Sequence, residues 1–189
     1  MEYRRGFKRE ANELAREVRQ ELGLGPIDPL NPCTLAHHLA IPLQPMSTLS
    51  TEAPFAVYYF SEVEQGTFSA MTVFAETERL IVYNDAHAPG RQASNLAHEL
   101  SHALLGHPPT PALNQHGCRE WIATIEAEAT WLGGALLIPE EAALVIARER
   151  LPLVAAARRY GVSQTMVRFR LNVTGAMQRM AYLFTGHRS

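Results

Sequence analysis

The first twenty-odd residues alternate apolar and charged side chains at helical spacing. The apolar positions lie three or four residues apart, as one face of an α-helix requires; they are Phe7, Ala11, Leu14, Ala15, Val18 and Leu22. Gly23 follows, and glycine is the residue that most often ends a helix. The pattern next predicts a short helix over residues 33–40, which ends at Ile41-Pro42.

Three segments rich in aromatic and β-branched residues come next, and this composition favours strands. They cover residues 55–60, 67–74 and 79–83, with Gly66 between the first two and a four-residue link before the third. Because the connections are short, we predict an antiparallel meander.

Helical spacing returns over residues 91–105 and ends at Gly106-His107-Pro108-Pro109. A Pro-rich loop leads to an apolar helix over residues 119–137, which Pro139 ends, and the remaining chain reads as short helices broken at Pro152, Gly161 and Gly175. The elements together predict an α+β fold, in which a small antiparallel sheet packs on the helix of residues 91–105.

That helix carries His98, Glu99 and His102. Histidines four residues apart lie about 40° apart around a helix axis and one turn along it. Both imidazoles can therefore bind one Zn²⁺. Glu99 is rotated by about 100° from His98, beside the metal's open position. There it can act as general base for a zinc-activated water that attacks a peptide bond, which is the chemistry of the His-Glu-x-x-His pattern.

A catalytic zinc needs a third protein ligand. A histidine six positions after His102 would serve, but Pro108 stands there, and we interpret His107 as a surface residue. The other option is a carboxylate from the helix of residues 119–137. Glu126 and Glu128 lie in an apolar segment, where burying a carboxylate without a cation is costly. Two residues apart on a helix, they diverge by about 200°, so only one can face the metal.

Residues 91–105 are similar to the active-site helix of the ImmA/IrrE family of metallopeptidases. Residues 126–139 resemble that family's second signature, in which two glutamates separated by one residue precede an apolar run and a proline. The resemblance covers about residues 5–175. It implies a zincin-like core with Zn²⁺ held by His98, His102 and Glu126, and with Glu99 as general base. At Thr130, related glutamate-liganded zinc peptidases often have an Asp or Asn that orients a ligand histidine, so weaker zinc binding is expected here.

Family members are typically regulatory, and the resemblance implies that the protein substrate is a helix-turn-helix transcriptional repressor. Two alternatives remain from the residues themselves. In the first, the chain is a non-catalytic DNA-binding regulator; in the second, it is a component of a toxin–antitoxin pair. In both, the metal site is structural or degenerate. Tyr83, His116 and Tyr160 are candidate stabilisers of an oxyanion.

Charge is unevenly distributed, although the formal net charge is only −2. Residues 148–189 hold eight arginines and one acidic residue, Glu149, which gives +7 there and −9 elsewhere. We therefore predict a peptidase domain over residues 1–147 and a basic helical extension over residues 148–189. Gly161 and the capping residue Ser163 indicate a helix-turn-helix-like unit within it. Arg168 and Arg170 point to DNA, but we favour packing of this unit on the core, with its arginines in solvent.

The chain of 189 residues, 47% hydrophobic and 19% charged, has the composition of a soluble globular protein. Its two cysteines, Cys33 and Cys118, argue against a disulfide scaffold. The longest apolar run is far shorter than the roughly 20 residues of a membrane span, and no apolar leader is visible. We therefore expect a cytoplasmic protein that does not enter a membrane.

Overall fold

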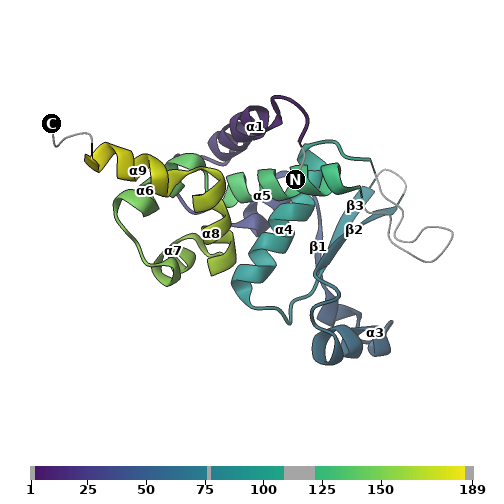
Figure 1. Ribbon diagram of the computed structural model, residues 1–189. Coiled ribbons are helices and arrows are strands. Elements are labelled where there is room, and N and C mark those ends of the chain that lie inside the picture. The colour runs from purple at the N-terminus through teal and green to yellow at the C-terminus, as the bar shows by residue number, and fades with distance from the viewer. Residues whose placement is uncertain (1–2, 76–77, 109–121, 186–189) are drawn as a thin grey trace.

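The computed structural model describes residues 3–75, 78–108 and 122–185 (Figure 1). In chain order, the elements are α1 (Phe7–Glu21), α2 (Pro32–His38), β1 (Leu43–Pro45), the 3₁₀ turn η1 (Met46–Leu49), α3 (Pro54–Tyr58), the π-helical turn η2 (Tyr59–Val63), β2 (Ala70–Ala75), β3 (Glu78–Tyr83), α4 (Pro89–Leu104), α5 (Ala123–Leu137), α6 (Glu140–Arg148), α7 (Leu153–Tyr160), α8 (Gln164–Val173) and α9 (Ala176–Thr185). The fold is α+β, as expected, and the long helices lie close to their predicted positions.

The sheet is small and mixed, with the strand order β1-β3-β2. Strands β2 and β3 pair antiparallel, with Ala70 opposite Tyr83 and Ala75 opposite Glu78, as the predicted hairpin requires. Strand β1 pairs parallel with the other edge of β3, opposite residues 81–83. Its three residues are too few for a period-two pattern to be recognised, so β1 was not expected.

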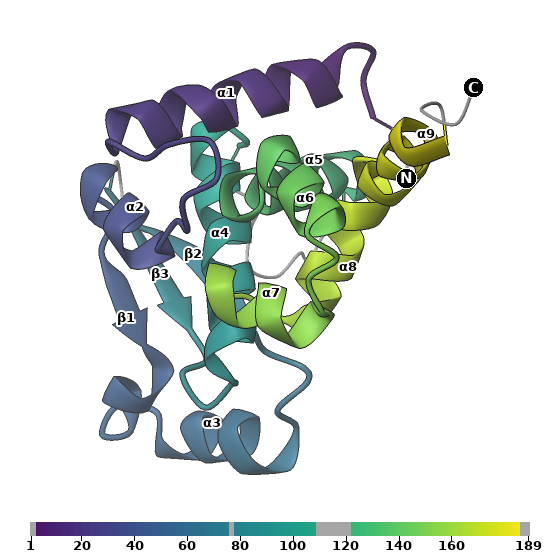
Figure 2. The same cartoon turned by 90° about the vertical axis from the view of Figure 1, so that its left-hand side faces the viewer.

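The strand predicted over residues 55–60 is wrong, because this segment forms α3 and the start of η2. Pro54 occupies the first helical turn, where its fixed φ favours helix. The rings of Phe55 and Tyr59, one turn apart, stack with their centroids 6.2 Å apart. The aromatic side chains that suggested a strand therefore stack on one face of a helix instead. In Figure 2, α3 and α1 lie at opposite ends of the molecule.

Helices α4 and α5 cross in contact at the centre of the molecule (Figure 1). They approach closely at Gly133, where a Cβ atom would lie 3.1 Å from the carbonyl carbon of Ala97. Because no side chain separates the two backbones there, Glu126, two turns earlier on α5, comes within reach of His98 on α4. Taken singly, none of the described helices is long and apolar enough to cross a membrane; α5 and α6 meet those criteria only as a pair bent by 58°.

The chain beyond Arg148 shares one hydrophobic core with the rest of the molecule. Gly161, with a φ of 64°, ends α7, and the Ser163 side chain accepts a hydrogen bond from the Met166 amide at the start of α8, as expected of the helix-turn-helix-like unit. The turn between these helices lies directly against α4. A Cβ atom at Gly90 would be only 2.5 Å from the carbonyl carbon of Val162.

Arg170 lies in the core, contrary to the expectation that the arginines of this unit face solvent. Its Nε donates to the carbonyl oxygen of Ile138 at 2.8 Å, and its guanidinium lies over the ring of Trp131. Burial lowers the pKa of Arg170 to about 10. Arg19 of α1, also buried, donates to the carbonyl oxygen of Leu136 at 2.7 Å. Two arginines therefore satisfy carbonyls at the C-terminal end of α5, where helical partners run out. Arg168 is exposed, as expected.

Candidate metal centre

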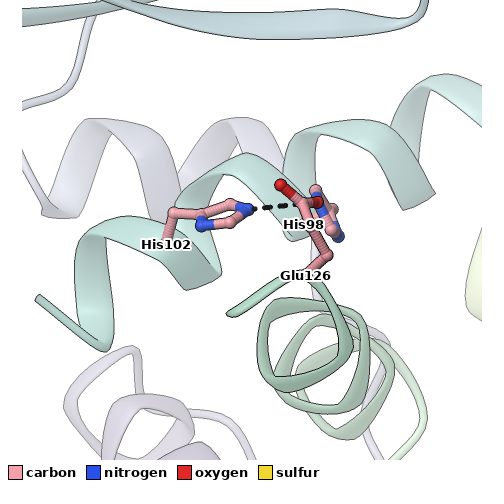
Figure 3. A group of neighbouring side chains, drawn as sticks. All are labelled: His98, His102 and Glu126. Carbon is pink, nitrogen blue, oxygen red and sulfur yellow. Dashed lines mark hydrogen bonds and ion pairs between the residues drawn. The ribbon is translucent and has the colours of Figure 1, made fainter. Parts of the chain in front are cut away.

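Two histidines of α4 and one glutamate of α5 converge on a single point. The Nε2 atoms of His98 and His102 lie 3.1 Å apart, and Glu126 Oε2 lies 3.0 Å from the first and 3.7 Å from the second. Figure 3 shows both rings and the carboxylate turned toward one another. The geometry brings together the three residues that the sequence suggested as ligands.

The spacing of these three atoms suits one tetrahedral zinc ion. Donor atoms about 2.0–2.1 Å from such an ion stand about 3.3 Å from one another, and the three observed distances bracket that value. Two imidazole nitrogens and a carboxylate are also a common ligand set for catalytic zinc. The residues present therefore fit the metal that the motif implies.

Electrostatics keep the carboxylate of Glu126 in its ionised form. Burial alone would raise its pKa, but hydrogen bonds with His102 and His98 and the attraction of these rings outweigh burial. The pKa of Glu126 consequently lies well below its usual range. A buried, ionised carboxylate beside two imidazoles is a ready ligand for a cation.

Glu99 stands beside this group. It is buried, and the hydroxyl of Thr72 on β2 donates a hydrogen bond of 2.7 Å to its Oε2. A cavity of about 290 Å³ is lined by Glu99 and by two of the three members of the metal group; its walls are Thr67, Phe68, Ser69, Ala70, Asn95, His98, Glu99 and Glu126. The second carboxylate is thus placed to act on a molecule that occupies the cavity. Sequence reasoning found Glu99 but missed Thr72, because nothing local marks a contact between a strand and a later helix.

The outward nitrogens of the two histidines have unequal partners. Among the described residues, His98 Nδ1 has the Thr130 hydroxyl as its partner, at 3.4 Å, which agrees with the weak support expected from threonine. His102 Nδ1 lies 3.0 Å from Nδ1 of His107, and Nε2 of His107 lies 3.4 Å from Glu128 Oε2. The interpretation of His107 as a surface residue is therefore wrong, since its side chain is only 9% exposed. Burial lowers the pKa of His107, as does the neighbouring His102, while Glu128 opposes this shift.

The end of α4 explains how His107 reaches His102. Gly106 adopts a φ of 62°, its amide donates to the Ala103 carbonyl, and the His107 amide donates to the His102 carbonyl. This is a Schellman motif, in which the amide of the second residue after the cap donates to the carbonyl of the residue five positions earlier. The signal was present in the sequence as His-x-x-x-Gly-His, with glycine at the only position that needs a positive φ.

Among the described residues, those named as candidate stabilisers of an oxyanion were not found at this cavity. Tyr83 and Tyr160 do not line the cavity, and Tyr160 is fully buried in α7. His116, Cys118 and the predicted start of a helix at residue 119 fall outside the described residues. Cys33 is an exposed free thiol.

Comparisons with known proteins agree with the site. A search of curated proteins gives no match. The family model described as IrrE N-terminal-like domain, Peptidase_M78, matches residues 56–172, more than half of the chain. The match includes the three members of the metal group and Glu99. The chain therefore belongs to the IrrE N-terminal-like family of metallopeptidases.

Proposed function

We propose that the protein is a zinc-dependent endopeptidase of regulatory type, with His98, His102 and Glu126 as zinc ligands and Glu99 as general base. The observation that carries this proposal is the convergence of two imidazoles and a carboxylate beside a cavity that a second, separate carboxylate, Glu99, also lines. A purely structural zinc site is usually closed by four protein ligands. Among the described residues, this group has three.

Zinc bound there would supply a water nucleophile near neutral pH and polarise the scissile carbonyl. Glu99 would accept a proton from the attacking water and deliver it to the leaving amine. The hydrogen bond from Thr72 fixes the direction in which the Glu99 carboxylate faces. Thr130 contacts Nδ1 of His98, and His107 contacts Nδ1 of His102; both contacts lie on the side of the ring opposite the Nε2 atom that would bind zinc.

The substrate we propose is a protein, specifically a helix-turn-helix transcriptional repressor. Resemblance of the two motifs to the ImmA/IrrE family supports this choice. The fold agrees with a peptide substrate, since β2 is an edge strand of the described sheet and Ala70, at its start, lines the cavity. An extended peptide can add to such an edge through main-chain hydrogen bonds. The burial of Arg170 removes one of the two arginines that pointed to DNA.

Glu99→Gln tests the proposal directly, because it removes the base and leaves the ligands in place. We expect about one zinc per chain by elemental mass spectrometry in both the wild type and the variant. Cleavage of a quenched-fluorescent peptide library should fall by about 10²–10⁴-fold in the variant. A wild-type chain that contains no zinc after supplementation, or a variant that cleaves as fast as the wild type, would overturn the proposal.

A further inference from the structure

His102 has a separate partner at each ring nitrogen. Its Nε2 faces His98 and Glu126, and its Nδ1 faces His107 on the opposite side of the ring. His107 in turn reaches Glu128 through its own far nitrogen. The three side chains form a continuous line that leads from the metal group into the α4–α5 interface.

When a metal is bound, only one placement of the ring protons is compatible with every contact along this line. A ligating Nε2 has no proton, so neutral His102 carries its proton on Nδ1. That N–H donates to Nδ1 of His107, which must then be unprotonated. His107 therefore carries its proton on Nε2, which faces the carboxylate of Glu128, a group that only accepts hydrogen bonds when ionised. Every nitrogen in the line then has a compatible partner.

Burial and charge make this line more than a chance contact. The side chains of His107 and Glu128 are each only 9% exposed, and Glu128 sits in the middle of the apolar helix α5. Its other oxygen lies 3.4 Å from Nε of Arg4, so the carboxylate is paired on both sides. A buried carboxylate behind a neutral imidazole increases the basicity of a ligand histidine at the far end. Glu126 and Glu128, two residues apart, thus face different groups.

We propose that His107 and Glu128 are positioning residues, which hold the ring of His102 and raise its affinity for zinc. The inference rests on the proposed function, because it assumes zinc at the His98–His102–Glu126 group. It assigns to His107 and Glu128 the support that Thr130, 3.4 Å from Nδ1 of His98, gives only weakly to the other histidine.

The test compares zinc dissociation constants of the full chain, measured by competition with a chromophoric chelator after metal removal. His107→Phe should weaken zinc binding by about 10–100-fold, the usual cost of losing such a partner. His107→Asn places an amide oxygen near the former Nδ1 and should recover most of that loss. Glu128→Gln should lie between His107→Phe and the wild type. His37→Phe, at an exposed histidine on α2, is the matched control and should bind as the wild type does.

Two further measurements separate positioning from a general loss of structure. The melting temperatures of the metal-free His107→Asn and Glu128→Gln variants should match that of the metal-free wild type. In ¹⁵N-labelled, zinc-loaded wild type, the Nδ1 proton of His102 should be protected from exchange, and His107→Phe should abolish this protection. The relay is overturned if His107→Phe binds zinc as tightly as the wild type, or if His107→Asn recovers nothing. A wild-type chain that binds no zinc overturns the proposed function itself.

Discussion

Thr72 Oγ1 donates a hydrogen bond of 2.7 Å to Glu99 Oε2, so that strand β2 holds the carboxylate that α4 carries. Thr72 faces Ile81 of β3 in the antiparallel ladder, which fixes its position along the strand. The orientation of the proposed base therefore depends on the sheet as well as on its own helix.

Thr72→Val should lower kcat by about tenfold or more, because a hydrogen bond to a charged group is worth about 1.5–3 kcal/mol. Zinc content should not change, since the hydroxyl of Thr72 bonds to Glu99, which is not one of the proposed ligands. Thr72→Ser keeps the hydroxyl and is the control. Steady-state kinetics on one cleaved peptide would measure the difference, and a wild-type kcat in Thr72→Val would contradict this role.

The two glutamates of α5 should differ in their effect on metal content. Glu126→Ala removes one of three converging groups and should abolish stoichiometric zinc. Glu128→Ala should retain about one zinc per chain at saturating metal, with an affinity lower by about 10–100-fold. Elemental mass spectrometry after gel filtration measures both. Zinc lost equally from the two variants at saturation would show that the ligand has been assigned wrongly.

Gly90→Ala should destabilise the fold. The added methyl would lie 2.5 Å from the carbonyl carbon of Val162 and 2.7 Å from the amide nitrogen of Ser163, and backbone atoms cannot move aside cheaply. Overpacking of this kind costs about 1–3 kcal/mol. Gly66→Ala is the control, because nothing lies within 4 Å of its Cβ position; it should leave stability unchanged or raise it by up to about 1 kcal/mol. Urea denaturation would report both, and equal midpoints would refute the contact.

Arg19→Met should lower the free energy of unfolding by roughly 3 kcal/mol, because it leaves one buried carbonyl without this donor, at about 1–3 kcal/mol, and removes hydrogen bonds to two part-buried carbonyls. Arg19 donates to the carbonyls of Leu136, Gly25 and Asp28. The melting temperature should fall by about 6–12 °C, given about 2–4 °C per kcal/mol for a chain of this size. Arg9→Met, at an exposed position on α1, should change stability by no more than about 0.5 kcal/mol. Similar melting temperatures for both variants would contradict a structural role for Arg19.

Features set by local periodicity could be predicted from the sequence. The face of α1 that includes Phe7 and Ala11 is buried as its spacing indicates, and Gly23 ends the helix. His98, Glu99 and His102 were located by helical spacing, and they lie on α4 as expected. The choice between Glu126 and Glu128 needed the crossing of α4 and α5 at Gly133, which no single-helix pattern contains.

The remaining errors come from tertiary contacts that override local preference. Aromatic residues near Phe55 favour strands in general, but β3 already pairs with β1 and β2, and the segment forms a helix instead. Arginine is a residue type that usually faces solvent, but Arg170 donates a hydrogen bond to a buried carbonyl at the C-terminal end of α5. His107 follows a helix stop, which suggested solvent, and the left-handed Gly106 turns it back.

The contact between Gly90 and the Val162–Ser163 turn has a consequence for synthesis of the chain. Helix α4, which carries His98 and His102, packs in part against a segment that is synthesised much later. Domains generally fold as units while the chain emerges from the ribosome, and this core is not complete until α8 has emerged. We therefore expect that α4 in a nascent chain lacks this packing surface until residues 162 and 163 have left the ribosome.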